Sequence, residues 1–257
     1  MPHPAPSFFP GRDGVRLASR AVGEGRALIL LHGFTGDATL WLREGRAEAI
    51  AARGHRVIMP DLRGHGASAK PHDAAAYPSD VLSDDVLALL EHLGLHGPDD
   101  YDLGGYSLGA RVVVRALVRG ATPGRAVVAG QGLRQVLGAG GGAEGGAFQR
   151  RVLAGFGTFA PDSPEGRAEQ WLRAADADPV ALLHVLDSLV TTPVELIGRL
   201  QVPTLVAVGD EDQRAATADR LASLLPHGSR AVVPGNHWTA AVAPELTEAI
   251  VAFLALD

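Results

Sequence analysis

Short apolar runs alternate with longer helical patterns along most of the chain, and this alternation limits the fold more than any other feature. The strand-like runs lie at residues 15–22, 27–32, 56–60, 101–106, 125–129, 203–208 and 229–233. The helical patterns lie between them, at 40–52, 79–94, 108–119, 214–225 and 239–255. Parallel strands need long crossover connections, and strands covered on both faces are apolar throughout. The order therefore predicts an α/β fold with a mostly parallel central sheet and helices on both faces.

One segment interrupts this alternation. A glycine-rich stretch at 138–146 is followed by helical patterns near 147–158, 165–177 and 179–190, and strand-like residues return only at 203. We expect residues 132–192 to form a helical lid inserted into a core made of residues 1–131 and 193–257. The alternative interpretation of the glycine-rich stretch is a simple flexible linker.

Composition excludes several classes of protein. The net charge is −6 and there is no dense block of Lys and Arg, so nucleic acid is not an expected partner. The chain has no cysteine, which rules out disulfides, thiolate metal ligands and a cysteine nucleophile. No apolar run is long enough for a membrane span, and the first residues lack the pattern of a secretory signal. We therefore expect a cytoplasmic protein that binds a small-molecule substrate, whereas its oligomeric state cannot be predicted.

The segment Gly-Tyr-Ser-Leu-Gly at 105–109 directly follows a predicted strand and directly precedes a predicted helix. A serine on such a sharp turn projects its hydroxyl above the sheet, and the two glycines avoid clashes in the turn. The start of the helix also favours negative charge there. This context predicts that Ser107 is a nucleophile.

A serine nucleophile needs a base, and the base needs a carboxylate that orients it. Gly235-Asn236-His237-Trp238 and Gly209-Asp210-Glu211-Asp212 each follow a predicted strand at the edge where parallel sheets bind ligands. The last loop before the final helix makes His237 the predicted base. Asp212 and Asp210 are both candidates for the carboxylate, and Asp212 is favoured because it lies further from the end of the strand.

The stretch Leu31-His32-Gly33-Phe34 follows another predicted strand. Acyl transfer needs hydrogen-bond donors aimed at a developing oxyanion, and backbone N–H groups are sufficient. The N–H groups of Phe34 and Leu108 are the predicted pair, and His32 is expected to shape its loop. This constellation needs no cofactor and no metal, and no cluster of His, Asp and Glu has the spacing of metal ligands.

Taken together, these motifs resemble the α/β-hydrolase superfamily, in its lid-bearing branch of esterases, lactonases and carbon–carbon bond hydrolases. The matching stretches are HGF at 32–34, DLRGHGAS at 61–68, GYSLG at 105–109, GDED at 209–212 and GNHW at 235–238. The resemblance implies that the last residue of GDED, Asp212, is the acid of the triad and that His65 is not catalytic. It also sets this chain apart from epoxide hydrolases and haloalkane dehalogenases, which carry an aspartate at the nucleophile position.

The activity that this resemblance implies is hydrolysis of a small or medium carboxylic ester or lactone. The candidate substrate contacts are Tyr106, Arg111, Trp171 and Trp238. Arg111 follows Ser107 by one helical turn, which resembles a menaquinone-pathway synthase that binds carboxylates, so a lyase or carbon–carbon hydrolase is an alternative. A cofactor-free haloperoxidase or perhydrolase with the same triad is another. A third alternative is a ligand receptor that retains the triad, because the fold alone does not determine function.

Overall fold

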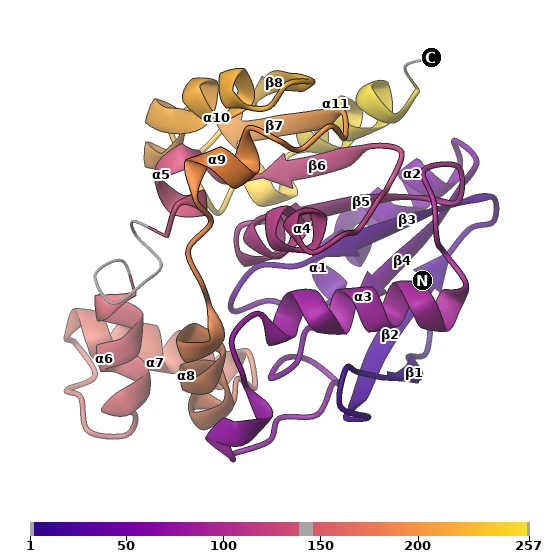
Figure 1. Ribbon diagram of the computed structural model, residues 1–257. Coiled ribbons are helices and arrows are strands. Elements are labelled where there is room, and N and C mark those ends of the chain that lie inside the picture. The colour runs from indigo at the N-terminus through magenta and orange to yellow at the C-terminus, as the bar shows by residue number, and fades with distance from the viewer. Residues whose placement is uncertain (1–2, 139–145, 256–257) are drawn as a thin grey trace.

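The computed structural model describes residues 3–138 and 146–255, and its strands form one eight-stranded sheet in the order β1-β2-β4-β3-β5-β6-β7-β8 (Figure 1). The strands are β1 Ser7–Pro10, β2 Arg16–Val22, β3 Arg26–Leu31, β4 His55–Pro60, β5 Tyr101–Tyr106, β6 Ala126–Ala129, β7 Thr204–Gly209 and β8 Gly228–Val233. The pairs β1–β2 and β2–β4 are antiparallel, and all the others are parallel. The predicted mostly parallel sheet is thus confirmed, and strands β3 to β8 all end at one edge of it.

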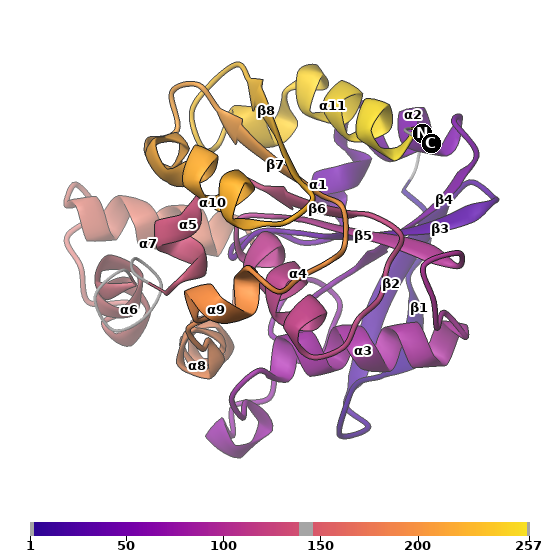
Figure 2. The same ribbon diagram turned by 45° about the horizontal axis from the view of Figure 1, so that its top comes forward.

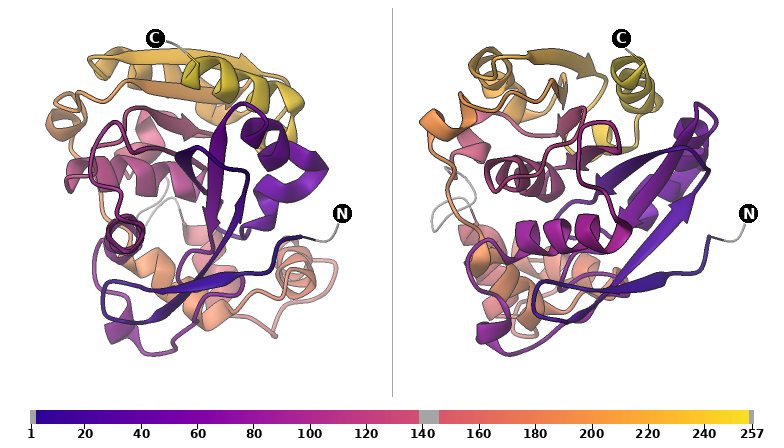
Figure 3. Two further views of the ribbon diagram at one scale, coloured as in Figure 1. Left: turned by 90° about the vertical axis from the view of Figure 1, so that its right-hand side faces the viewer. Right: turned by 45° about the vertical axis from the view of Figure 1, so that its right-hand side comes forward.

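Helices cover both faces of the sheet (Figures 2 and 3). They are α1 Thr39–Leu42, α2 Arg46–Ala51, α3 Val81–Leu93, α4 Leu108–Val118, α5 Leu133–Val136, α6 Ala147–Ala154, α7 Pro164–Ala174, α8 Pro179–Ser188, α9 Val194–Ile197, α10 Ala218–Leu224 and α11 Pro244–Leu254. Single 3-10 turns lie at Arg43–Gly45, Ala74–Ala76, Gln213–Thr217 and Ala240–Val242.

The two faces of the sheet carry separate apolar cores, because successive residues of a strand point to opposite sides. Leu28 and Leu30 of β3 pack in a cluster with residues of α1, α2 and α11. Ile29 and Leu31 pack in a second cluster with residues of α3, α4 and α10. This double coverage is why the central strands read as continuous apolar runs.

Helices α6, α7 and α8, called the α6–α8 group below, lie beyond one end of the sheet (Figures 1 and 2). They share a small apolar cluster of their own, formed by Val152, Leu153, Leu172, Leu182 and Leu186. Leu133 and Val136 of α5 pack instead into the apolar cluster that contains Ile29 and Leu31. The α6–α8 group therefore begins later in the chain than the predicted segment 132–192. Most of the glycine-rich stretch, residues 139–145, lies outside the described residues.

Two features of the fold were not in the sequence-based expectation. Strand β1 is a short edge strand that ends at a proline and pairs only with β2, so its pattern gives little signal. Strand β2 was predicted as a strand, but its antiparallel pairing with β4 depends on the chain's overall path. Among the described residues, no helix has both the length and the apolar character that a membrane span requires.

Candidate active site

The turn between β5 and α4 holds Ser107 in an unusual backbone conformation, with φ 55° and ψ −111°. The turn leaves no room for a side chain at either flanking glycine, Gly105 or Gly109. A methyl group at Gly105 would lie 2.4 Å from the carbonyl carbon of Gly109, and one at Gly109 would lie 2.6 Å from the carbonyl oxygen of Leu31. A non-glycine residue adopts positive φ only where the surroundings enforce it, and such strain clusters at active sites.

Three side chains from three loops at the carboxyl edge of the sheet form a continuous hydrogen-bonded chain. The hydroxyl of Ser107 donates to Nε2 of His237 at 2.9 Å, and Nδ1–H of His237 donates to Oδ2 of Asp212 at 2.6 Å. The carboxylate of Asp212 is 1% exposed and the imidazole of His237 is 13% exposed. The arrangement has the geometry that activates a hydroxyl: nucleophile, base and orienting acid in sequence.

The neighbouring carboxylates of the same loop lie elsewhere. Oδ1 of Asp210 accepts the backbone N–H of Gly235 at 2.7 Å and so braces the turn that leads to His237. Glu211 is exposed. Of the three acidic residues in the GDED stretch, Asp212 alone contacts the imidazole within the described part of the chain.

The environment of Asp212 keeps its carboxylate ionised. Burial opposes ionisation, but hydrogen bonds from His237 and from the backbone N–H of Arg214 outweigh it and lower the pKa of Asp212 below its ordinary value. The guanidinium of Arg214 lies 3.3 Å from Oδ1 and adds to the effect. An ionised carboxylate at this position stabilises the imidazolium that forms when His237 accepts a proton.

The loop after β3 passes directly beside Ser107. A methyl group at Gly33 would lie 3.5 Å from the Cβ of Ser107. The N–H of Leu108 is at the first position of α4, where a helix leaves its donors unpaired. Neither the N–H of Phe34 nor that of Leu108 donates a hydrogen bond to another of the described residues. Both N–H groups are thus unused within the described residues, and their role as oxyanion donors stays a prediction.

Buried polar residues hold this loop in place. Oδ1 of Asp61 accepts the N–H of Ala38 at 2.7 Å, and Nε2 of His32 accepts the N–H of Leu62 at 2.9 Å. Nε2–H of His65 donates to the carbonyl of Phe34. Burial lowers the pKa of His32 to about 4, and burial together with the neighbouring His32 lowers that of His65 to about 4. Both histidines are thus neutral structural groups, as expected for His32 and His65.

Tyr106 is buried, although the sequence suggested a substrate contact. Its hydroxyl donates to the carbonyl of His237 at 2.8 Å, and its ring lies 5.3 Å from the imidazole. The hydroxyl is therefore used within the protein. This position favours support of the His237 loop over contact with substrate.

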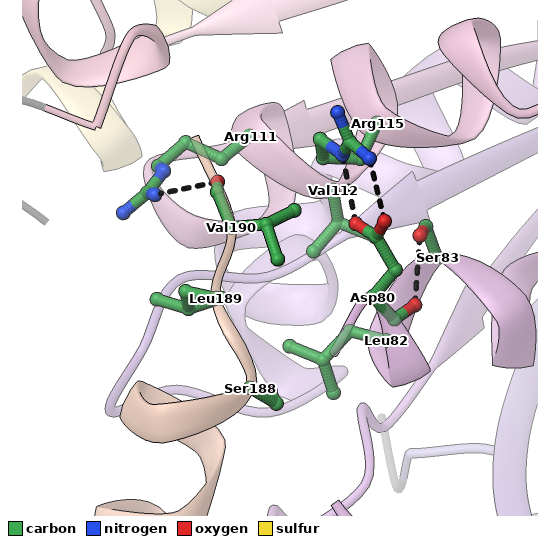
Figure 4. Close-up of a pocket in the computed structure, with 9 residues that line it drawn as sticks. All are labelled: Asp80, Leu82, Ser83, Arg111, Val112, Arg115, Ser188, Leu189 and Val190. Atoms are coloured by element: carbon green, nitrogen blue, oxygen red, sulfur yellow. Dashed lines mark hydrogen bonds and ion pairs between the residues drawn. The ribbon is translucent and has the colours of Figure 1, made fainter. Parts of the chain in front are cut away.

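Arg111 lies on the side of α4 that faces the segment after α8 (Figure 4). Its guanidinium approaches the carbonyl of Val190 at 3.5 Å, in a small pocket that also contains Asp80 and Arg115. Asp80 is paired with Arg115 at 2.5 Å rather than with Arg111. Burial lowers the pKa of Arg111. The side chain of Arg111 thus contacts the segment after α8, and its role in binding substrate stays a prediction.

Trp171 and Trp238 contact each other across the junction of α7 and the loop after β8. Their ring centroids are 5.6 Å apart, and Trp238 lies 5.7 Å from the ring of His237. The side-chain amide of Asn236 fixes this loop by accepting the N–H of Trp238 at 2.9 Å. The sequence pointed to both tryptophans separately but gave no signal that they touch.

The support residues Asp61, Asn236 and Arg214 were missed by sequence reasoning, although Asp61 lies in the recognised DLRGHGAS stretch. Their roles depend on loops that meet only in the folded chain. Among the residues that the structure describes, no three His, Asp or Glu side chains are grouped so that they could hold a metal ion.

Comparisons with known proteins identify the family and fold that this chain resembles. The alpha/beta hydrolase fold family model matches residues 26–129. A non-heme chloroperoxidase, CPO-A1, from Kitasatospora aureofaciens is 27% identical over 262 residues, covering 91% of this chain and 92% of that protein. An epoxide hydrolase from Caballeronia sordidicola is 37% identical over 81 residues, but this match covers only 32% of this chain and 24% of that protein. A thermophilic esterase from Thermogutta terrifontis, with malate bound, superimposes with a TM-score of 0.71 at 25% identity, covering 97% of this chain and 98% of that one.

The matched region carries β3, β4, β5 and β6 with the oxyanion loop and the Ser107 turn. The match to the chloroperoxidase covers 91% of this chain and therefore extends beyond that region. Sheet order, the strained serine turn and the family match lead to one conclusion, that this chain belongs to the α/β-hydrolase superfamily.

Proposed function

We propose that this α/β-hydrolase cleaves a small or medium carboxylic ester or lactone through an acyl-enzyme on Ser107. One observation carries the proposal: the hydrogen-bonded chain from Asp212 through His237 to Ser107, with distances of 2.6 and 2.9 Å. The N–H groups of Phe34 and Leu108, which donate to no other described residue, support it. The esterase likeness along nearly the whole chain agrees with this class of reaction.

The steps follow from the geometry. Oγ of Ser107 attacks the carbonyl carbon of the substrate while Nε2 of His237 takes the hydroxyl proton. The N–H groups of Phe34 and Leu108 stabilise the oxyanion of the tetrahedral intermediate. His237 then donates its proton to the alcohol oxygen, the bond between that oxygen and the acyl carbon breaks, and the alcohol leaves. Water, deprotonated by His237, attacks the acyl carbon and releases the acid and the free serine.

The α6–α8 group is proposed to act as a lid that selects substrates without supplying chemistry. It holds exposed aromatic side chains, Phe148 and Trp171, beside charged residues such as Arg151 and Arg173. A mixed surface of this kind suits small or medium substrates better than long acyl chains, which need a continuous apolar channel.

The other candidate reactions have weaker support. The serine at position 107 argues against epoxide hydrolysis, because the epoxide hydrolases that this chain resembles carry an aspartate there. A lyase or carbon–carbon hydrolase that binds a substrate carboxylate through Arg111 is disfavoured by the contact of that side chain with Val190. A receptor would retain the triad but turn over slowly, which measured turnover distinguishes.

Perhydrolysis is the second candidate, because the chloroperoxidase from Kitasatospora aureofaciens covers almost the whole chain. In that reaction hydrogen peroxide replaces water in the attack on the acyl-enzyme and yields a peracid. We expect ester hydrolysis to dominate in water. A perhydrolase would instead form peracid from acetate and hydrogen peroxide, which oxidation of bromide reports.

The test of the main proposal is covalent labelling. A fluorophosphonate should attach to Ser107, as mass spectrometry of the digested protein would show, and should abolish hydrolysis of phenyl acetate. Ser107→Ala should lose roughly 10⁴-fold or more in kcat, since each triad member contributes on that scale. Labelling at another serine, or retained activity in Ser107→Ala, would overturn the proposal.

A further inference from the structure

Four aromatic rings form a series that runs from the core to the α6–α8 group through the imidazole of His237. The centroid distances are 5.3 Å from Tyr106 to His237, 5.7 Å from His237 to Trp238, and 5.6 Å from Trp238 to Trp171. The exposed fraction is 4% at Tyr106, at the core end of the series, and 66% and 46% at Trp238 and Trp171, at its outer end. Tryptophan is usually largely buried, so two adjacent exposed tryptophans beside a catalytic histidine need a function.

The position of Trp238 identifies the part of the substrate that it would meet. The histidine of a serine hydrolase donates its proton to the leaving oxygen, so that oxygen must lie within hydrogen-bond reach of Nε2 of His237. The carbonyl oxygen lies instead toward the N–H groups of Phe34 and Leu108. A ring in contact with His237 is therefore next to the alcohol part of an ester rather than next to its oxyanion.

The chemistry of the pair identifies the group that it would hold. The planes of Trp171 and Trp238 are inclined at 65°, an edge-to-face contact that leaves ring surface open to a third ring. Other aromatic residues of the α6–α8 group are covered by cations, with Arg173 over Phe156 and Arg151 over Phe148. Within the described residues no cation lies over either tryptophan, so their faces are left for a neutral flat group.

We propose that Trp171 and Trp238 form the leaving-group subsite of this enzyme and that it takes esters whose alcohol part is aromatic, such as aryl esters. The inference rests on the proposed function, since it names the substrate class of the same site. It also assigns Trp171 of α7 a direct role in specificity, with the contact between the two rings joining the α6–α8 group to the catalytic loop.

The kinetic test compares esters that form the same acetyl-enzyme. Phenyl acetate has an aromatic alcohol, and hexafluoroisopropyl acetate has an alcohol of similar acidity without a ring. Trp171→Ala should lower kcat/KM for phenyl acetate roughly three- to tenfold, the scale of one aromatic contact, and leave hexafluoroisopropyl acetate unchanged. Trp238→Phe should retain most of the preference. Phe8→Ala, which removes an exposed aromatic ring of β1 at the far edge of the sheet, is the matched control and should change kcat/KM for neither substrate.

A second readout does not depend on catalysis. The chain has three tryptophans, and the third, Trp41, is buried at 1% exposure, so added phenol should quench mainly the fluorescence of the exposed pair. Quenching should saturate in the native protein, weaken in Trp171→Ala, and be unaffected in Phe8→Ala.

The outcomes separate this inference from the proposed function. Three results would overturn the leaving-group subsite even if the phosphonate still labels Ser107. They are equal slowing of both acetates in Trp171→Ala, a change in that variant only in the preference for acyl length, and quenching that does not saturate. Saturable quenching without any labelling or hydrolysis would instead retain the aromatic subsite and overturn ester hydrolysis.

Discussion

The loops that carry the triad and the α6–α8 group meet at the same edge of the sheet but are held by different means. Each triad loop is fixed by backbone hydrogen bonds and by glycines that no other residue could replace, as at Gly105 and Gly109. The α6–α8 group depends on a small separate apolar cluster and on a few polar ties, such as Nε2 of His72 to Asp178 at 2.8 Å. The contrast predicts that the chemistry proposed for the triad and the substrate choice proposed for the α6–α8 group can be changed independently.

The largest difference between variants is expected from replacing the two acidic residues of the loop after β7. Asp212→Asn should lower kcat roughly 10⁴-fold, because the amide favours the wrong tautomer of His237 and cannot stabilise the imidazolium. Asp210→Asn keeps a side-chain oxygen that can still accept the N–H of Gly235, so it should cost far less. Steady-state kinetics with phenyl acetate and with hexafluoroisopropyl acetate would measure both. A larger loss in Asp210→Asn would show that the wrong carboxylate has been assigned.

The pH dependence of stability should distinguish the same two regions. His32 and His65 have pKa values of about 4 in the folded state against about 6.5 in the unfolded chain, so between these values the unfolded state binds more protons. The stability that they contribute is complete above pH 6.5 and is lost as the pH falls toward 4. The α6–α8 tie should persist in this window, since hydrogen bonds from Ala181 and His72 outweigh burial and lower the pKa of Asp178.

Melting temperatures measured from pH 8 to pH 4 would test this prediction. His65→Gln should flatten the decline, because it removes one of the two groups that resist protonation in the fold. His96→Gln, at an exposed histidine, is the control and should leave the decline unchanged. An identical decline in His65→Gln and in the native protein would contradict the assignment of the acid sensitivity to this loop.

The smallest effect on kcat is expected from a substitution in the interior of the α6–α8 group. Leu182→Ala removes a side chain with 1% exposure and should destabilise the group by about 2–5 kcal/mol. Hydrogen exchange should quicken in α6, α7 and α8 while β5 and β6 stay protected. The kcat for hexafluoroisopropyl acetate should change less than roughly threefold, because no triad residue belongs to the α6–α8 group. A large loss of kcat on this substrate would mean that the two regions are not independent.

The sequence predicted the parts of the molecule that are encoded locally. The strand, the tight turn and the helix around Ser107 lie within a few residues of one another, so the glycine spacing and the apolar pattern were sufficient. The choice of Asp212 over Asp210 came from position in the loop and from the family pattern, and the structure places Asp212 at the imidazole.

The parts that sequence could not give depend on contacts between distant segments. Helical spacing placed Arg111 one turn after Ser107, but the direction of its side chain follows from the chain around Val190. In the same way, Tyr106 is turned inward by the carbonyl of His237, and Trp171 meets Trp238 only because α7 folds back over the loop after β8. Spacing along the sequence determines which face a residue occupies, whereas its partner is determined by tertiary packing.

The positive φ of Ser107 also has a consequence for how this chain can evolve. A left-handed serine raises the energy of the native state, and glycine at the same position would relieve that strain at the loss of the nucleophile. A lineage that no longer needs catalysis would therefore gain stability by losing the serine first. A serine at this position costs backbone strain that glycine would avoid. Its retention is therefore a sensitive marker of selection for activity.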